Sequence, residues 1–294
     1  MNVLTIDVEE YFHVSAFEQI ISSHDWPTYE SRVEKTTHRL LKRLSETGTL
    51  ATFFVLGWVA ERHPELIRTI RKNGHEVASH GYAHQVLTVL TPPQFRADVR
   101  RAKRILEDIL GEPVVGYRAP SFTIMEDTVW ALRTLVEEGY VYDSSIFPVW
   151  HDRYGLHGAN PYCHRLMTAA GPIWEVPPST LPVGNMRLPV AGGGYFRLWP
   201  YRLLRRWLRK IELSGHPLVV YLHPWEIDPE QPRVRAALLS RCRHYLNLHK
   251  TEGRLMQLLQ DLHREGAIKK TGFVKQEDVP LRTFLDNRFG RYYA

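Results

Sequence analysis

Two carboxylates and a pair of histidines in this 294-residue chain are spaced for hydrolytic chemistry. Asp7 and Glu9 are two residues apart, so on a strand both side chains point to the same face. His80 and His84 are four apart in SHGYAH, which puts both imidazoles on one side of a helical turn. Two neutral imidazoles and one carboxylate can hold a divalent ion and leave a position open for water. The other carboxylate is then available as a base.

Each of these motifs also has an interpretation without a metal ion. The acidic pair alone is compatible with a solvated turn, and a chain with 15 histidines contains chance pairs. The zinc-protease pattern is excluded, because Gly81 stands where that pattern needs Glu. Arg118 in GYRAPSF can hold a buried carboxylate ionised or form a structural ion pair. His223, directly after the apolar VVYL, can act as a general acid or be a buried core histidine.

The elements that must position these residues follow from an alternation of short apolar runs and helical patterns. The predicted strands are 3–6, 52–56, 76–79, 114–117, 140–143, 173–176 and 218–222, and the predicted helices are 64–74, 91–111, 127–139, 201–211, 232–253 and 254–266. This pattern predicts an α/β fold, a distorted (β/α) barrel of about seven parallel strands with long loops and a helical C-terminal extension. Carboxyl ends of parallel strands meet on one face, and the reactive residues stand at those ends.

The domain organisation predicted from the sequence is a single barrel. It spans residues 1–266 and includes 147–200, a stretch rich in Pro, Gly and aromatic residues that we interpret as long loops over the active face. Residues 267–294 form a C-terminal extension without an assignable role. Cys163 and Cys242 also have no assignable role.

Composition excludes several classes of protein. Two cysteines exclude a disulfide framework, and 11% aromatic residues exclude disorder as the main state. No membrane-spanning run occurs, and the acidic start is unlike a signal peptide, so we expect a cytoplasmic protein, with peripheral contact to a membrane as an alternative. The net charge of +6 indicates an acidic partner only weakly, and nothing predicts nucleic-acid binding.

Aromatic residues near the expected active face are candidates for stacking on sugar rings: Phe122, Trp174, Tyr195 and Trp225. Plain packing is the alternative for each of them. Gly192–Gly194 would let a loop approach a substrate closely or would form a mobile turn. Residues 201–211 form a basic amphipathic helix, which is either a solvated face or a contact with an anionic membrane or polymer.

The ordered strings TID, SHGYAH, RAPSF, YDSS and YLHP resemble the metal-dependent polysaccharide deacetylases of carbohydrate esterase family 4. The strings DVEEYFHV, GGGYFRLWP and HPWEIDPEQPR look like a bacterial subgroup encoded with exosortase and PEP-CTERM systems and exopolysaccharide genes. The resemblance implies hydrolytic N-deacetylation of N-acetylhexosamine units in a polysaccharide or its precursor. It implies the following roles: Asp7 base, His80 and His84 metal ligands, Arg118 orienting the base, His223 general acid, and the Ser121 backbone N–H in the oxyanion site.

One position departs from the family pattern. Val8 stands where the family has a second, metal-binding aspartate, and Glu9 takes the place used by members that shift the acid by one residue. Glu10 should point to the opposite side of the strand. We therefore expect Glu9 to complete the site, with Zn²⁺ as the default ion.

Three alternatives remain open from the sequence. The chain could be an amide hydrolase of the same superfamily that acts on a small non-sugar substrate. It could instead be a sugar-binding protein without catalysis, although the base, acid, arginine and ligands are all present. An iron oxygenase with two histidines and one carboxylate disagrees with the alternation of strands and helices.

Overall fold

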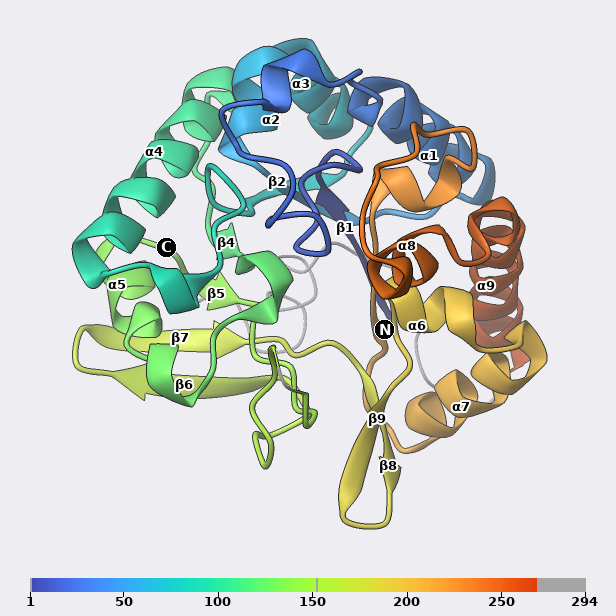
Figure 1. Ribbon diagram of the computed structural model, residues 1–294. Helices are drawn as coiled ribbons and strands as arrows, with labels where there is room; N and C mark the ends of the chain where they lie inside the picture. Colours follow the sequence, from blue (N-terminus) through green and yellow to red (C-terminus); the bar gives the residue numbers. More distant parts are fainter. Residues whose placement is uncertain (1, 152, 269–294) are drawn as a thin grey trace. The chain divides into compact units, whose positions relative to one another are not determined.

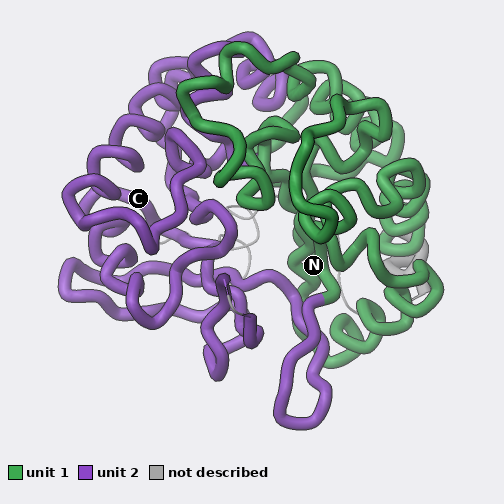
Figure 2. The backbone as a smooth tube through the Cα atoms, in the orientation of Figure 1, with its two compact units in different colours: residues 1–52, 73–76, 190–294 green, residues 53–72, 77–189 purple. Residues whose placement is uncertain are grey.

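A computed structural model describes residues 2–151 and 153–268, and Figure 1 shows how their helices and strands follow one another along the chain. The chain divides into two compact units, which Figure 2 distinguishes by colour. Unit 1 consists of residues 1–52, 73–76 and 190–294, and unit 2 of residues 53–72 and 77–189. None of the helices in the described ranges has the length and apolar character needed to cross a membrane.

The strands belong to two sheets. They are β1 (Val3–Val8), β2 (Thr52–Val55), β3 (Glu76–Ser79), β4 (Gly116–Tyr117), β5 (Tyr142–Asp143), β6 (His164–Thr168), β7 (Gly171–Glu175), β8 (Thr180–Val183), β9 (Met186–Pro189) and β10 (Val219–Leu222). The larger sheet has the order β10-β1-β2-β3-β4-β5-β7-β6, and β8 pairs with β9. The pairs β1–β10, β3–β4, β4–β5 and β5–β7 are parallel, whereas β6 is antiparallel to β7. The predicted α/β class with a mostly parallel sheet is therefore confirmed.

All seven predicted strands occur, as β1, β2, β3, β4, β5, β7 and β10. The interpretation of 147–200 as loops with one strand is wrong, because β6, β8 and β9 also lie there. Residues of β6 alternate between half-buried and exposed, and both β8 and β9 contain a proline. These strands lack the continuous apolar run that marks a strand covered on both faces.

The helices agree with the prediction in part: the two helices predicted over 232–253 and 254–266 are instead 238–245 and 248–268, and 33–47, 57–62 and 193–198 are helices that were not predicted. The described helices are α1 (Val33–Thr47), α2 (Gly57–Arg62), α3 (Pro64–Lys72), α4 (Pro92–Leu110), α5 (Ala131–Glu137), α6 (Gly193–Leu198), α7 (Tyr201–Leu213), α8 (Leu238–Tyr245) and α9 (Leu248–Ile268). The predicted ends of α4 are confirmed: Thr91 and Gln94 form a capping box, and Gly111 is left-handed with φ +68°.

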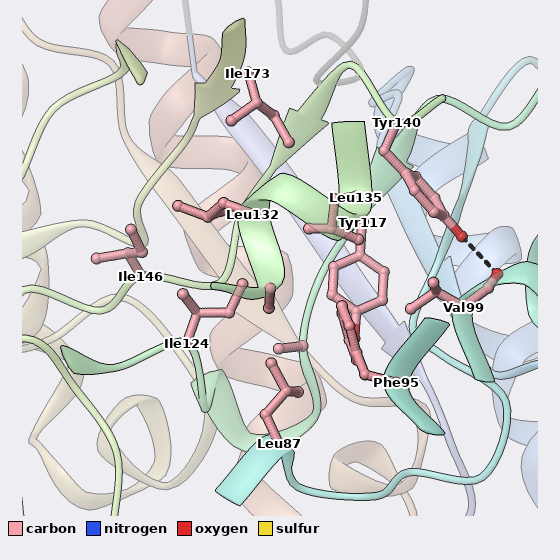
Figure 3. Close-up of a cluster of buried hydrophobic side chains, with 12 residues drawn as sticks. Leu87, Phe95, Val99, Tyr117, Ile124, Leu132, Leu135, Tyr140, Ile146 and Ile173 are labelled. Atoms are coloured by element: carbon pink, nitrogen blue, oxygen red, sulfur yellow. Dashed lines mark hydrogen bonds between the residues drawn. The ribbon is translucent and has the colours of Figure 1, made fainter. Parts of the chain in front are cut away.

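A buried hydrophobic cluster fixes α4 and α5 in unit 2 (Figure 3). Phe95 and Val99 of α4 are fully buried with Tyr117 of β4 and Leu135 of α5. The Tyr140 hydroxyl donates to the Val99 carbonyl at 3.0 Å, so its one polar atom is satisfied inside the cluster. This packing holds the strands that end in Arg118 and Asp143.

Unit 1 is organised around the parallel pair β1 and β10. Val3 lies opposite Val219 and Ile6 opposite Leu222, and every residue of both strands is buried. On the outside, Glu252 of α9 accepts hydrogen bonds from two arginines of α1. The carboxyl ends of β1 and β10 therefore lie side by side.

The predicted domain limits remain predictions. The barrel was expected over 1–266 and the extension over 267–294. Helix α9 continues to Ile268, and residues 269–294 lie outside the described residues.

Candidate active site

The carboxyl ends of β1 and β10 bring three reactive side chains of unit 1 together. His223 Nε2 lies 3.8 Å from Asp7 Oδ2 and 3.6 Å from Glu9 Oε1. Asp7 is 1% exposed and Glu9 is 2% exposed, while 15% of the His223 side chain is exposed. An imidazole that reaches two carboxylates in this setting can exchange protons with a bound molecule.

A third carboxylate, Glu226, holds the other side of the His223 ring. The short 3₁₀ helix η5 (Pro224–Ile227) turns Glu226 back so that its Oε1 lies 2.6 Å from His223 Nδ1. Glu226 Oε2 accepts a hydrogen bond from Arg197 Nε at 2.7 Å, and both side chains are buried. This arrangement aims His223 Nε2 at Asp7 and Glu9.

The carboxylates also set the charge of His223. Burial alone would lower the pKa of the imidazole, but Glu9, Glu226 and Asp7 outweigh it and raise the pKa to about 9. Burial by itself would raise the pKa of Glu226, yet Arg197 and His223 hold it below its usual value. His223 is therefore a protonated imidazole at neutral pH, as a general acid requires.

Trp225 orients Glu9 and is largely buried. Its Nε1–H donates to Glu9 Oε1 at 3.0 Å. Its rings stack on His223 at 5.1 Å and on His244 at 4.3 Å between centroids, and the residue is 6% exposed. Stacking of Trp225 on a substrate stays a prediction.

Glu10 turns away from this cluster, as the strand geometry predicts. Its carboxylate accepts hydrogen bonds from the Arg32 backbone N–H at 2.9 and 3.1 Å and from the Ser31 hydroxyl. These contacts tie Glu10 to the start of α1. Glu9 is therefore the glutamate that lies beside Asp7 and His223.

In unit 2, His80 and His84 follow β3, and their ring centroids are 5.4 Å apart. The predicted helical turn is wrong, because the segment is a bend in which Gly81 has φ +74° and His84 has φ +50°. Asp98 of α4 shapes this bend by accepting the backbone N–H groups of Tyr82 and Ala83. The hydrophobic pattern of α4 gave no signal for Asp98, which lies next to the buried Val99.

The tautomer of His80 follows from its partner. His80 Nδ1 lies 2.8 Å from the Arg118 carbonyl oxygen, which can only accept a hydrogen bond. Nδ1 therefore carries the hydrogen, and Nε2 presents the lone pair to a ligand. The backbone carbonyl of Arg118 thus fixes the tautomer of His80.

The Arg118 side chain is fully buried in unit 2. Its Nε donates to the Ser144 carbonyl at 3.2 Å and its Nη2 to the Ser144 hydroxyl at 2.8 Å. The guanidinium also lies over the Phe54 ring, 4.2 Å from its centroid. The predicted action of Arg118 on Asp7 stays a prediction.

The turn after Arg118 has a strained backbone. Ser121 and Phe122, in the 3₁₀ helix η3 (Pro120–Phe122), have φ of +54° and +55°. Each left-handed residue other than glycine costs about 1–3 kcal/mol, so the surroundings must hold this turn in place. Such strain is common where a backbone N–H is presented to a ligand.

The other predicted sugar contacts differ in exposure. Trp174 of β7 and Tyr195 of α6 are half-buried and keep accessible surface. Phe122 is 7% exposed and packs on Phe147 at 5.2 Å. Gly192 does not serve the approach of a substrate, because it lies against the backbone of Tyr221 in β10.

The donor chemistry fits a divalent metal. Glu9, His80 and His84 each offer one ligand atom, a carboxylate oxygen or an imidazole nitrogen. Glu9 and His80 are buried and His84 is half-buried. Two imidazoles and one carboxylate are a donor set that zinc and related ions take.

Two family models match most of the described chain. Residues 24–137 match the model described as polysaccharide deacetylase, and residues 144–267 match a model described as a domain of unknown function, DUF3473. His80, His84 and Arg118 lie in the first segment, and Glu226 and His223 lie in the second.

Two distant relatives are similar to part of the chain. The chain is 34% identical over 110 residues to the peptidoglycan deacetylase-like protein FGM2 of Gibberella zeae. This alignment covers 37% of this chain and 32% of the relative. It is 30% identical over 96 residues to a peptidoglycan-N-acetylglucosamine deacetylase of Bacillus cereus. This alignment covers 32% of this chain and 35% of the relative. The matches span about a third of the length of these two relatives.

A solved structure shares the fold over nearly the whole chain. The crystal structure of a probable polysaccharide deacetylase from Pseudomonas aeruginosa PAO1 superimposes with a TM-score of 0.60 at 17% identity, covering 98% of this chain and 91% of the other. This likeness confirms the predicted distorted α/β barrel fold.

Proposed function

We propose that this chain, which joins a polysaccharide deacetylase segment to a DUF3473 segment, is a metal-dependent hydrolase. It removes acetyl groups from N-acetylhexosamine units of a polysaccharide or of its precursor. The observation that carries the proposal is the buried group of His223, Asp7 and Glu9, in which an imidazolium faces two carboxylates. The names of the distant relatives support an acetylated polysaccharide as the substrate.

We assign Glu9, His80 and His84 as the ligands of the ion, and zinc as the ion favoured by this donor set. When bound, the ion lowers the pKa of its water and polarises the acetamide carbonyl. The His80 tautomer set by the Arg118 carbonyl supports this role, because it leaves Nε2 as the ligand atom.

The remaining steps belong to residues of this chain. Asp7 takes a proton from the attacking water, and the water oxygen becomes part of acetate. The Ser121 backbone N–H donates a hydrogen bond to the oxyanion of the tetrahedral intermediate. His223 Nε2–H then protonates the departing amine as the C–N bond breaks. Arg118 orients Asp7, and the products are acetate and a free amino sugar.

The test is release of acetate from N-acetylglucosamine oligomers by the purified protein. We expect Asp7→Asn and His223→Ala each to abolish acetate release, and Asp127→Asn and His38→Ala, which replace exposed residues, to leave it unchanged. Removal of the metal with a chelator should stop the reaction, and added Zn²⁺ should restore it. Full activity in Asp7→Asn or His223→Ala would refute the mechanism.

The physiological polymer is a finer part of the proposal. The subgroup strings around Glu9, Tyr195 and Glu226 support an exopolysaccharide made with exosortase and PEP-CTERM systems. Trp174 and Tyr195 are the aromatic residues best placed by exposure to meet its sugars. Hydrolysis of a small non-sugar amide alone, or binding of oligosaccharide without acetate release, would replace this substrate assignment.

We further propose that α7 contacts an anionic membrane. Its apolar residues Leu204, Leu208 and Ile211 are buried in unit 1, so they cannot insert into lipid. Its exposed face carries five cations and its one acid is buried, which supports an electrostatic contact. These cations are Arg202, Arg205, Arg206, Arg209 and Lys210.

Vesicle binding tests this contact. Wild-type protein should sediment with vesicles rich in phosphatidylserine at low salt and should be released at high salt. The charge-reversal variant R202E/R206E should bind several-fold more weakly, whereas R202K/R206K should bind like the wild type. Equal binding by both variants, or binding to an anionic polymer without binding to vesicles, contradicts the proposal.

A further inference from the structure

Two buried carboxyl groups of unit 2 lie outside the proposed chemistry. Asp143 ends β5 and Glu175 ends β7, and the two residues are direct partners in the parallel pair. Both are fully buried. The two neighbouring carboxyl groups interact with each other. Two buried carboxylates side by side repel, and a hydrogen bond between them would require a proton on one of them.

The other hydrogen bonds of the pair leave one oxygen for that proton. Asp143 Oδ1 accepts the Ser145 hydroxyl at 2.5 Å and Oδ2 accepts the Ser145 backbone N–H at 3.2 Å. Glu175 Oε1 accepts the Ile146 N–H at 3.1 Å. Among the described residues, no N–H or hydroxyl group donates to Glu175 Oε2, although this atom is buried. A bare carboxylate oxygen there would be costly, so protonation is favoured.

The groups that face the pair favour the proton as well. Burial raises the pKa of Asp143 to about 6, and burial together with the Asp143 charge raises the pKa of Glu175 well above its usual value. Cys163 adds to the shift at Glu175, and Tyr117 of β4 also faces Asp143. His164 lies opposite Glu175 in the sheet, with its Nδ1 2.8 Å from the Tyr162 carbonyl.

The segment that follows Asp143 holds the strained turn after Arg118. The Ala119 backbone N–H donates to Ser145 Oγ at 2.7 Å, and the same hydroxyl donates to Asp143. In parallel, Ser144 Oγ accepts Arg118 Nη2 and donates to the Val176 carbonyl at 2.7 Å. Both chains of hydrogen bonds run from the turn to the ends of β5 and β7.

We infer that Asp143 and Glu175 share one proton and act as a positioning pair that locks the turn 119–122 through Ser145. The lock would help catalysis by positioning the Ser121 N–H, and only this benefit rests on the proposed function. The lock itself is a property of unit 2 and is measurable in protein without activity.

Two variants separate the proton from the packing. Glu175→Gln supplies an amide N–H in place of the shared proton and keeps the shape of the side chain. Glu175→Leu keeps the volume and removes the hydrogen bond. Glu126→Gln, an exposed site of the same unit, is the control.

The first measurement is the urea midpoint of unfolding between pH 5 and pH 8. The folded pair binds a proton that the unfolded chain releases, because its pKa values are raised on folding. The pair therefore contributes a fall of the midpoint as pH rises through this range, opposite in sign to the contribution of His75 below pH 6.5. Glu175→Gln should flatten that fall, and Glu126→Gln should retain it. An unchanged slope in Glu175→Gln overturns the inference.

The second measurement is local. Amide hydrogen exchange at Ala119 should be faster in Glu175→Leu and Ser145→Ala than in the wild type, and unchanged in Glu175→Gln. With an N-acetylated substrate, kcat should fall at least about tenfold in Ser145→Ala with little change in KM, since small displacements of an oxyanion donor are costly. Unaltered exchange at Ala119 in both Glu175→Leu and Ser145→Ala contradicts the lock. Absence of any wild-type activity would contradict only the proposed function.

Discussion

His223 Nδ1 and Glu226 Oε1 are 2.6 Å apart, and the opposite nitrogen of the same ring faces Asp7 and Glu9. One carboxylate therefore fixes the plane and charge of the imidazole while two others border its proton. Glu226 is in turn held by Arg197, so the placement of His223 depends on a buried ion pair between α6 and η5.

Removing Glu226 should damage both stability and turnover. Glu226→Ala leaves the Arg197 guanidinium buried without its carboxylate, and we expect a loss of about 3–5 kcal/mol in the free energy of unfolding. Glu226→Gln should cost less stability. It should lower kcat and change KM little, because the imidazole loses a charged partner. Urea unfolding and steady-state kinetics check both outcomes. Glu230→Gln, an exposed neighbour, should match the wild type in each.

Trp225 and Trp174 should respond differently to substitution. Trp225→Phe keeps a ring between His223 and His244 but removes the N–H that donates to Glu9, so we expect a lower kcat with KM little changed. Trp174→Ala should mainly raise KM for oligosaccharides, since Trp174 keeps exposed surface. Kinetics on N-acetylglucosamine oligomers of several lengths separate the two effects. A rise in KM alone for Trp225→Phe would show that the indole meets the substrate.

His75 should make the protein sensitive to acid. Burial lowers the pKa of His75 from 6.5 to about 4, and its Nδ1 accepts the Ala51 backbone N–H at 3.2 Å. Between pH 6.5 and pH 4, His75 therefore binds a proton in the unfolded chain but not in the folded chain. We expect the free energy of unfolding to fall by up to about 3 kcal/mol between pH 6.5 and pH 4.

The variant His75→Gln isolates this contribution. Its amide oxygen can still accept the Ala51 N–H, but it does not titrate, so the decline in stability toward pH 4 should be shallower. His38→Gln replaces an exposed histidine and should keep the wild-type decline. Urea denaturation at a series of pH values measures each slope, and equal slopes in His75→Gln and the wild type would exclude His75 as the cause.

Gly192 and Gly194 should give opposite results when changed to alanine. A Cβ at Gly192 would lie 2.2 Å from the Tyr221 carbonyl oxygen, a backbone atom that cannot move aside cheaply. We expect Gly192→Ala to lower the free energy of unfolding by about 1–3 kcal/mol or more. At Gly194 the nearest atom is 4.0 Å away, and the residue lies in α6, so Gly194→Ala should be neutral or stabilising. Thermal and urea unfolding of the two variants provide the comparison.

The sequence by itself predicted seven of the strands, the helix α4 with its ends, and which reactive residues stand at strand ends. Largely apolar runs predicted β2 and β10, because strands buried on both faces are rich in apolar side chains. Thr91 and Gly111 predicted the ends of α4, since helix caps depend on neighbours in sequence. Features of this kind depend on residues that are close in sequence, so they can be predicted from the sequence alone.

The tertiary structure alone decided which partners these residues meet. Glu226 stands three residues after His223 and was not among the predicted site residues, and its role depends on Arg197, which comes from another helix. Trp225 was predicted to meet sugar, and the structure adds a hydrogen bond to Glu9 and ring contacts with His223 and His244 that the sequence did not indicate. Asp143 and Glu175 share a proton only because β5 and β7 pair in register. Hydrogen-bond partners and desolvation arise from contacts between distant segments, and no spacing in the sequence encodes them directly.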